Sequence, residues 1–122
     1  MTQSCSCSTA PRLIFSCSGA ADVGEVADRA ARQLTRAGVG RMYCLAGVGG
    51  GVPAILEQTA SASAILAIDG CTTACASASL KQAGFKDFSR LQLADLGLNK
   101  GASPASAENI DRVVIAAREQ FQ

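Results

Sequence analysis

The chain has 122 residues, of which 48% are hydrophobic, so it can bury the core of one domain without help from disulfides or a structural metal. Its 11 Lys and Arg residues nearly balance its 10 Asp and Glu residues, and aromatic residues make up only 4% of the chain. Nucleic acid is therefore not expected as a partner, because basic surfaces and aromatic stacking platforms bind it.

The N-terminal segment MTQSCSCSTA lacks the basic and apolar regions of a secretory signal. No stretch of the sequence approaches the ~20 apolar residues that a membrane-spanning helix needs. We therefore expect a cytoplasmic protein that does not bind membranes.

Histidine is absent, whereas cysteine occurs six times. Hydrolysis of the Ser-His-Asp or Cys-His kind is excluded in its ordinary form, because no histidine can serve as the base. In a reducing cytosol, six cysteines indicate metal ligands or reactive thiols rather than structural disulfides.

The first predicted elements are a strand and a helix. Residues 12–15 form a short apolar run that ends in a loop of small polar residues, which is typical of a buried strand. From Asp22 onward the apolar residues recur at the spacing of one helical face, and Gly38 marks the end of this helix. Asp22 with Glu25 resembles a capping box, so we expect Asp22 to be the N-cap.

The middle of the chain predicts two strands on either side of a helix. Residues 42–45 are expected to form the second strand, and the glycine-rich stretch 47–51 a loop. A helix is predicted over residues 53–60, with Pro53 in its first turn. Residues 64–68 are apolar throughout, which is typical of a central strand covered on both faces.

The last part of the chain predicts two further helices and an edge strand. A helix is expected over residues 72–83, directly after the Asp69-Gly70-Cys71 turn. Residues 88–93 form a strand with polar residues interspersed, which favours an edge position. Ser103 and Pro104 predict the N-cap and first turn of the final helix. The apolar stripe of that helix is Ile110, Val113, Val114, Ala117 and Phe121.

The order βαβαβαβα predicts an α/β fold, in which residues 11–122 form a single three-layer α/β/α domain. Its four-stranded sheet is expected to be mostly parallel and Rossmann-like or flavodoxin-like. Residues 1–10 are expected to form a flexible N-terminal tail. Ligands of such folds bind outside the carboxyl ends of the strands, where the strand order reverses.

Four cysteines stand where predicted strands pass into loops or helices. Cys17, Cys44 and Cys71 lie at or just after the ends of the first three strands, so they are expected to converge at one edge of the sheet. Cys75 follows Cys71 by four residues, which predicts that both project from one helical face. The helix N-terminus beside Cys71 is expected to lower the pKa of its thiol.

Several blocks of the sequence also match a known family. CSGAADVGEVADRAARQL, MYCLAGVGGG, AILAIDGCTTACA, AGF and LADLGLNKG follow one another across about residues 12–118. Together they resemble the DGC-domain proteins, which are named for a central Asp-Gly-Cys and described as zinc-binding because of four cysteines. The resemblance implies that the metal ligands are Cys17, Cys44, Cys71 and Cys75. It implies no reaction, and Cys5 and Cys7 lie outside the matched region.

Two classes of function remain open for these thiols. The first is a zinc-binding protein that serves metal handling, sensing or partner recognition, with another soft metal or an iron–sulfur centre as the alternative cofactor. The second is a thiol redox enzyme or sulfur carrier, in which Cys71 is the reactive cysteine and Cys75 or Cys17 resolves it. Whether the protein is an enzyme therefore stays open, as does a protein partner or a homodimer.

Structural interpretations stand beside these functional ones. Cys44 and Cys75 are also compatible with simple packing, since cysteine is among the most buried residues. Asp69 is expected either to accept a hydrogen bond behind a metal ligand or to form the turn. The glycines at 47–51 lack the spacing of a dinucleotide fingerprint and the Lys of a phosphate loop, so close backbone approach explains them equally well.

Overall fold

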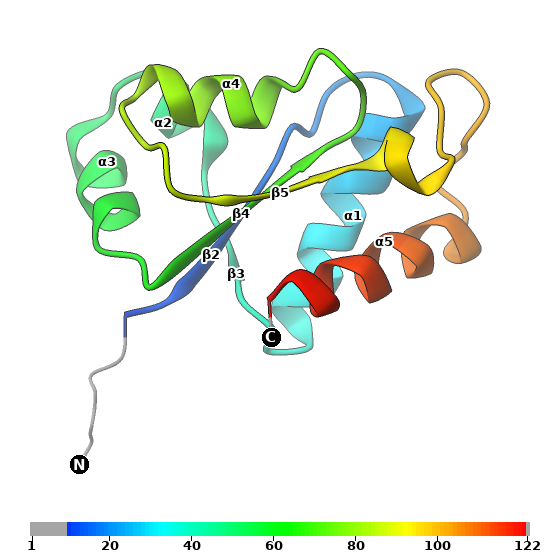
Figure 1. Cartoon of the computed structure of the whole chain (residues 1–122), viewed down its shortest axis with the longest axis horizontal. Coiled ribbons are helices and arrows are strands. Elements are labelled where there is room, and N and C mark those ends of the chain that lie inside the picture. Colours follow the sequence, from blue (N-terminus) through cyan, green and yellow to red (C-terminus); the bar gives the residue numbers. More distant parts are fainter. Residues whose placement is uncertain (1–9, 122) are drawn as a thin grey trace.

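The computed structural model describes residues 10–121, along which strands and helices alternate (Figure 1). The strands are β2 (Arg12–Ser16), β3 (Arg41–Met42), β4 (Ala64–Asp69) and β5 (Ser89–Gln92). The helices are α1 (Asp22–Arg36), α2 (Leu45–Gly49), α3 (Pro53–Ala60), α4 (Cys75–Gln82), the 3-10 helix η1 (Leu93–Leu96) and α5 (Ala107–Gln120). The predicted tail, with Cys5 and Cys7, lies outside the described residues except for Ala10.

Within the described part of the chain, the strands form a four-stranded parallel sheet in the order β3-β2-β4-β5. Along the central pair, the register runs from Arg12 opposite Ala64 to Ser16 opposite Ile68. The predictions of an α/β fold, a central β4 and an edge position for β5 are confirmed. Of the two arrangements expected, the observed strand order is the flavodoxin-like one.

Helices cover both faces of the sheet, because successive side chains of a strand point to opposite sides. On one face, Ile14, Leu66 and Ile68 pack with α1 and α5. On the other face, Leu13, Phe15, Ile65 and Ala67 pack toward α2, α3 and α4. Figure 1 shows these two groups of helices on either side of the strands. None of the helices within residues 10–121 has the length and apolar character needed to cross a membrane.

The backbone around Cys44 differs from the prediction. β3 ends at Met42 rather than at residue 45, and Cys44 is the N-cap of α2, which occupies part of the predicted glycine loop. A Cβ atom on Gly47 would lie 2.7 Å from the Ile55 side chain of α3. The glycine therefore permits α2 to pack closely on α3 instead of forming a loop.

Two later helices begin at different residues from those predicted. α4 starts at Cys75 rather than at residue 72, because Ala74 adopts the left-handed conformation with φ 55° and ψ 51°. The N-cap of α5 is Ser106, whose hydroxyl accepts a backbone N–H of the first helical turn at 3.1 Å. The predicted roles of Ser103 and Pro104 in starting α5 are therefore wrong. The predicted strand 88–93 is also shorter, because η1 begins at Leu93.

Candidate functional site

The strand order reverses between β2 and β4, whose carboxyl ends therefore border the crevice where ligands of this fold class bind. Cys17 directly follows β2, and its backbone N–H donates to the Ile68 carbonyl of β4 at 3.1 Å. Asp69 ends β4 and is followed by Gly70 and Cys71. The prediction that Cys17 and Cys71 lie at this edge of the sheet is confirmed.

A pocket of about 450 Å³ opens at this edge. Its walls come from the loop after β2, the start of α1, the loop after β4 and the start of α4. Three of the four predicted cysteines line it, namely Cys17, Cys71 and Cys75, together with Lys100. Cys17 and Cys71 are half-buried, whereas Cys75 is exposed.

Cys44 lies apart from this group. It is exposed and lines a neighbouring hollow of about 700 Å³, which it shares with Cys17. Cys17 therefore lies between the two cavities. The structure thus brings three thiols around one pocket and leaves the fourth, Cys44, in the neighbouring hollow.

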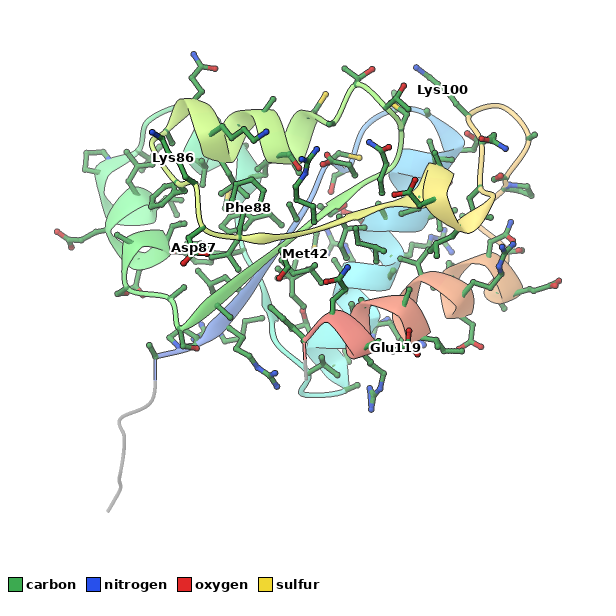
Figure 2. The ribbon with its side chains drawn as sticks, in the orientation of Figure 1. Met42, Lys86, Asp87, Phe88, Lys100 and Glu119 are labelled. Atoms are coloured by element: carbon green, nitrogen blue, oxygen red, sulfur yellow. The ribbon has the colours of Figure 1, made fainter. Side chains whose placement is uncertain are left out.

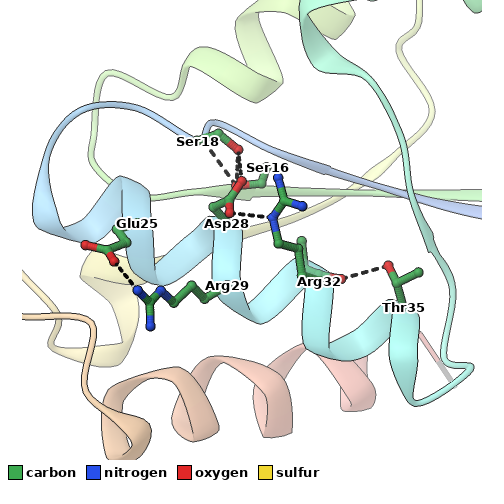
Figure 3. Close-up of polar contacts among 8 residues, drawn as sticks. Ser16, Ser18, Glu25, Asp28, Arg29, Arg32 and Thr35 are labelled. Carbon is green, nitrogen blue, oxygen red and sulfur yellow. Dashed lines mark hydrogen bonds and ion pairs between the residues drawn. The ribbon is translucent and has the colours of Figure 1, made fainter.

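The hollow beside Cys44 is lined in part by Ser18, Asp28 and Arg32, and Figure 3 shows the polar contacts among these three residues. The Ser18 hydroxyl donates to one carboxylate oxygen of Asp28 at 2.8 Å, and Nε of Arg32 donates to the other at 2.7 Å. Partial burial acts to raise the pKa of Asp28, but the hydrogen bonds from Arg32 and Ser18 outweigh it and keep this pKa below its usual value. This network ties the loop after β2 to the side of α1.

Asp69 is buried, and it acts as the cap of α4. Its carboxylate accepts the backbone N–H of Ala76 at 2.7 Å, and from Ser77 both the backbone N–H at 3.3 Å and the hydroxyl at 2.6 Å. No side chain at Ala74, the N-cap position, can do this, so the carboxylate comes from the end of β4 instead. Asp69 therefore does not only form a turn, which was one of its two expected roles. It also caps α4 and so fixes Cys75 in the first turn of that helix.

Cys71 lies in the turn before α4 and not in the helix. The prediction that Cys71 and Cys75 share a helical face is wrong, because the left-handed Ala74 separates the turn from the helix. The pKa of the Cys71 thiol is lowered, as predicted, but the main cause is hydrogen bonding from the side chain and backbone of Thr73, with a smaller contribution from the charge of Lys100. The surroundings of Cys71 therefore shift its equilibrium toward the thiolate.

Cys17 is held by a different contact. The backbone N–H of Gly70 donates to its Sγ at 3.3 Å, which links the loops after β2 and β4.

Backbone strain occurs next to two of the thiols. Ser18, after Cys17, and Ala74, before Cys75, are the non-glycine residues of the described chain with positive φ. Each such residue costs about 1–2 kcal/mol, so the fold must hold them in place.

Two glycines let α1 approach the strand-end loops closely. A Cβ on Gly24 would lie 2.5 Å from the Gly19 carbonyl oxygen, and a Cβ on Gly70 would lie 2.8 Å from the backbone of Val23. Real Cβ atoms do not come so near to a backbone, so any other residue would push α1 away from the pocket. The glycine of the Asp-Gly-Cys motif is therefore required for packing against α1.

Sequence reasoning missed Lys100, although it lies in the quoted segment LADLGLNKG. Asp22 was expected to be the N-cap of α1, but the N-cap is Ala21. The Asp22 carboxylate instead accepts the backbone N–H groups of Gly101 at 2.9 Å and Ser103 at 3.0 Å. These contacts hold the loop that brings Lys100 to the pocket. These bonds lower the pKa of Asp22. No local pattern marks this contact, because its partners are about 80 residues apart.

The thiols at this edge of the sheet do not form a metal site as they are placed. Within residues 10–121, no group of three or more His, Cys, Asp or Glu side chains is arranged to hold a metal ion. A tetrahedral four-sulfur zinc site needs all four sulfurs at about 2.3 Å from one point. As placed, the four cysteines do not fit such a site, since Cys44 lies in the neighbouring hollow.

Two comparisons with known proteins find relatives of this chain. A sequence profile described as the DGC domain matches residues 13–117. A curated protein of Pseudomonas aeruginosa strain PAO1, named "Anaerobic and virulence modulator AnvM", is 34% identical over 104 residues, which cover 84% of this chain and 79% of that protein. No solved structure matches the chain. These matches confirm the resemblance that the sequence motifs indicated.

Proposed function

The chain belongs to the DGC domain family, and we propose that it acts through a reactive thiol site in which Cys71 is the reactive cysteine. In this proposal Cys17 and Cys75, which line the same pocket, are the thiols that can resolve an oxidised Cys71. The relative in Pseudomonas aeruginosa is named as a modulator, and we propose for this chain a regulatory role in which the oxidation state of the site is the signal. We also propose a cytoplasmic location, where reducing conditions keep a thiol of this kind reduced.

One observation carries the proposal: Cys71 lies at the wall of a pocket that two further thiols line, and its pKa is lowered, chiefly through hydrogen bonding from Thr73. Hydrogen bonds to sulfur favour the thiolate, which is the nucleophilic form of cysteine. A neighbouring thiol can resolve an oxidised cysteine, and reversible oxidation then becomes a two-state switch. The strained residues Ser18 and Ala74 add support, because strain persists where a site requires a particular backbone.

Site-resolved alkylation tests this function. The full-length protein is treated with iodoacetamide near neutral pH, and mass spectrometry follows the modification of each cysteine with time. We expect Cys71 to react several times faster than Cys17, Cys44 and Cys75, because its lowered pKa favours the nucleophilic thiolate. Equal rates at all four positions would contradict the proposal.

Soft-metal binding is the second candidate, and the gathering of Cys17, Cys71 and Cys75 at one pocket favours it. Zinc is the preferred metal for a set of thiolates, with another soft metal or an iron–sulfur centre as the alternative. This candidate requires the loops that carry the cysteines to move, because their present arrangement does not form a metal site.

Metal analysis separates the two candidates. Protein purified without added metal is analysed for zinc and iron, and its free thiols are counted before and after chelation. Near-stoichiometric zinc that falls in Cys17→Ser, Cys71→Ser and Cys75→Ser would support the metal site. The same experiment on Cys44→Ser shows whether the fourth predicted ligand takes part. Metal-free protein whose thiols all titrate would exclude this candidate.

A further inference from the structure

Lys100 is the cationic residue among those that line the cysteine pocket, and Asp69 is the acidic one. The two are not equivalent toward a ligand. Asp69 is buried and its carboxylate is engaged by the first turn of α4, whereas Lys100 is exposed. The ion pairs found among residues 10–121 join Arg29 to Glu25 and Arg32 to Asp28, so Lys100 is left available to a ligand.

The loop that carries Lys100 is anchored on both sides of it. The backbone N–H of Asn99 donates to the Ser103 hydroxyl at 2.8 Å. Gly101, which has a φ of 88°, and Ser103 both donate their backbone N–H groups to the Asp22 carboxylate at the start of α1. The position of Lys100 at the pocket is therefore built into the fold by a contact between two segments about 80 residues apart.

Cys71 and Lys100 also share a second opening. Both line an adjoining cavity of about 350 Å³, which is walled further by Thr72, Ala94 and Leu98. Cys71 thus lies between two cavities, and Lys100 borders both of them. A molecule that reached the Cys71 sulfur through either opening would pass within reach of the ammonium group.

We propose that the substrates of Cys71 are low-molecular-weight disulfides that carry carboxylates, and that Lys100 recognises the carboxylate. This inference rests on the proposed thiol function and names its substrate class. The pocket volume lies in the range of small-molecule sites. The flexible four-carbon stem of a lysine suits a charge at variable distance from the reacting sulfur.

The reaction is thiol–disulfide exchange. The Cys71 thiolate attacks one sulfur of the disulfide, a new S–S bond forms between Cys71 and that half of the molecule, and the other half leaves as a thiolate. Cys71 is oxidised to the mixed disulfide, and the departing half is reduced. The disulfide itself is the oxidant, so no other reactant is needed.

Oxidised glutathione, which has a net negative charge, and cystamine, which is cationic, provide the test. Each is added to the full-length protein at low ionic strength, and mass spectrometry follows the mixed disulfide at Cys71. The variants are Lys100→Gln and, as a matched control, Lys86→Gln. Figure 2 shows Lys86 and Lys100 at opposite ends of the molecule, so the control removes the same charge far from the pocket.

We expect Lys100→Gln to slow the reaction with oxidised glutathione by about tenfold at low salt and to slow the reaction with cystamine far less. The small effect of the Lys100 charge on the pKa of Cys71 acts on both reactions alike, so the difference between the two disulfides reports carboxylate recognition. Lys86→Gln should react like the unmodified protein. The effect should shrink as salt is raised toward 0.5 M, because the charge is then screened within a few ångströms.

Failure of this inference differs from failure of the thiol function. If Cys71 reacts rapidly with neutral iodoacetamide but Lys100→Gln leaves the glutathione rate unchanged, the substrate class is wrong and the thiol function stands. If Cys71 reacts no faster than the other cysteines, with iodoacetamide and with both disulfides, then the substrate class and the thiol function are both wrong.

Discussion

The carboxylate of Asp69, at the end of the central strand β4, accepts a 2.6 Å hydrogen bond from the hydroxyl of Ser77 in α4. Together with two backbone N–H groups of the same helical turn, this bond makes a strand residue the cap of the following helix. Aspartate at the first position of Asp-Gly-Cys therefore fixes the helix that carries Cys75.

We expect Asp69→Ala to lower the free energy of unfolding by about 2–3 kcal/mol, because it removes a cap and leaves buried donors without a partner. Urea denaturation followed by circular dichroism measures the change. Asp87→Ala, at an exposed position, is the control and should change stability by less than about 0.5 kcal/mol. Equal stabilities of the two variants would contradict the capping role.

Thr73 is expected to control the reactivity of Cys71. Replacing Thr73 with Ala removes the hydroxyl that donates to the sulfur, so the pKa of Cys71 should rise and less thiolate should be present near neutral pH. We expect the alkylation rate of Cys71 at pH 7 to fall by about three- to tenfold, since one pKa unit changes the thiolate fraction about tenfold. The rate at a pH well above the pKa should change little. Thr72→Ala, one residue earlier and also exposed, should leave the rate unchanged at both pH values.

Gly24 and Gly70 are expected to tolerate no side chain. Gly24→Ala and Gly70→Ala each place a methyl group against a backbone at 2.5–2.8 Å, which should cost about 1–3 kcal/mol of unfolding free energy. Gly19→Ala is the matched control, because a Cβ there meets nothing within 4 Å. Urea midpoints of the three variants give the comparison, and a Gly24→Ala protein as stable as Gly19→Ala would contradict the close packing of α1.

The lowered pKa of Asp22 predicts that this residue stabilises the fold in a pH-dependent way. Its pKa is lowered in the folded protein by the N–H groups of Gly101 and Ser103. A carboxyl group with a lowered folded pKa stabilises the fold above its unfolded pKa of about 3.9, and this contribution is lost as the pH falls through the folded pKa. Asp22→Asn should therefore melt at a lower temperature than the unmodified protein at pH 7, and the difference should shrink below about pH 4.

Thermal denaturation between pH 7 and pH 2.5 measures this difference, with Asp111→Asn, an exposed residue of α5, as the control. A melting difference for Asp22→Asn that stays constant across the range would show that its carboxylate charge does not hold the loop of Lys100.

The sequence predicted best those features that depend on local patterns. The apolar run of β4 and the helical period of α1 gave a central strand and an amphipathic helix, because burial on two faces or on one stripe leaves a direct trace in residue order. The helix α2 was missed because its glycines favour a loop locally, whereas packing against Ile55 stabilises the helix. The start of α4 was missed because Ala74, a strong helix former, is held in a left-handed conformation.

The sequence by itself therefore determined the α/β fold and the positions of Cys17 and Cys71 at the carboxyl ends of the strands. Only the tertiary structure decided that Cys75 joins them around one pocket, that Cys44 faces another, and that Lys100 lies at the rim. The physical reason is the range of the interactions involved. Strand ends follow from neighbouring residues, whereas the pocket depends on contacts such as that of Asp22 with Gly101, which form only when distant loops pack together.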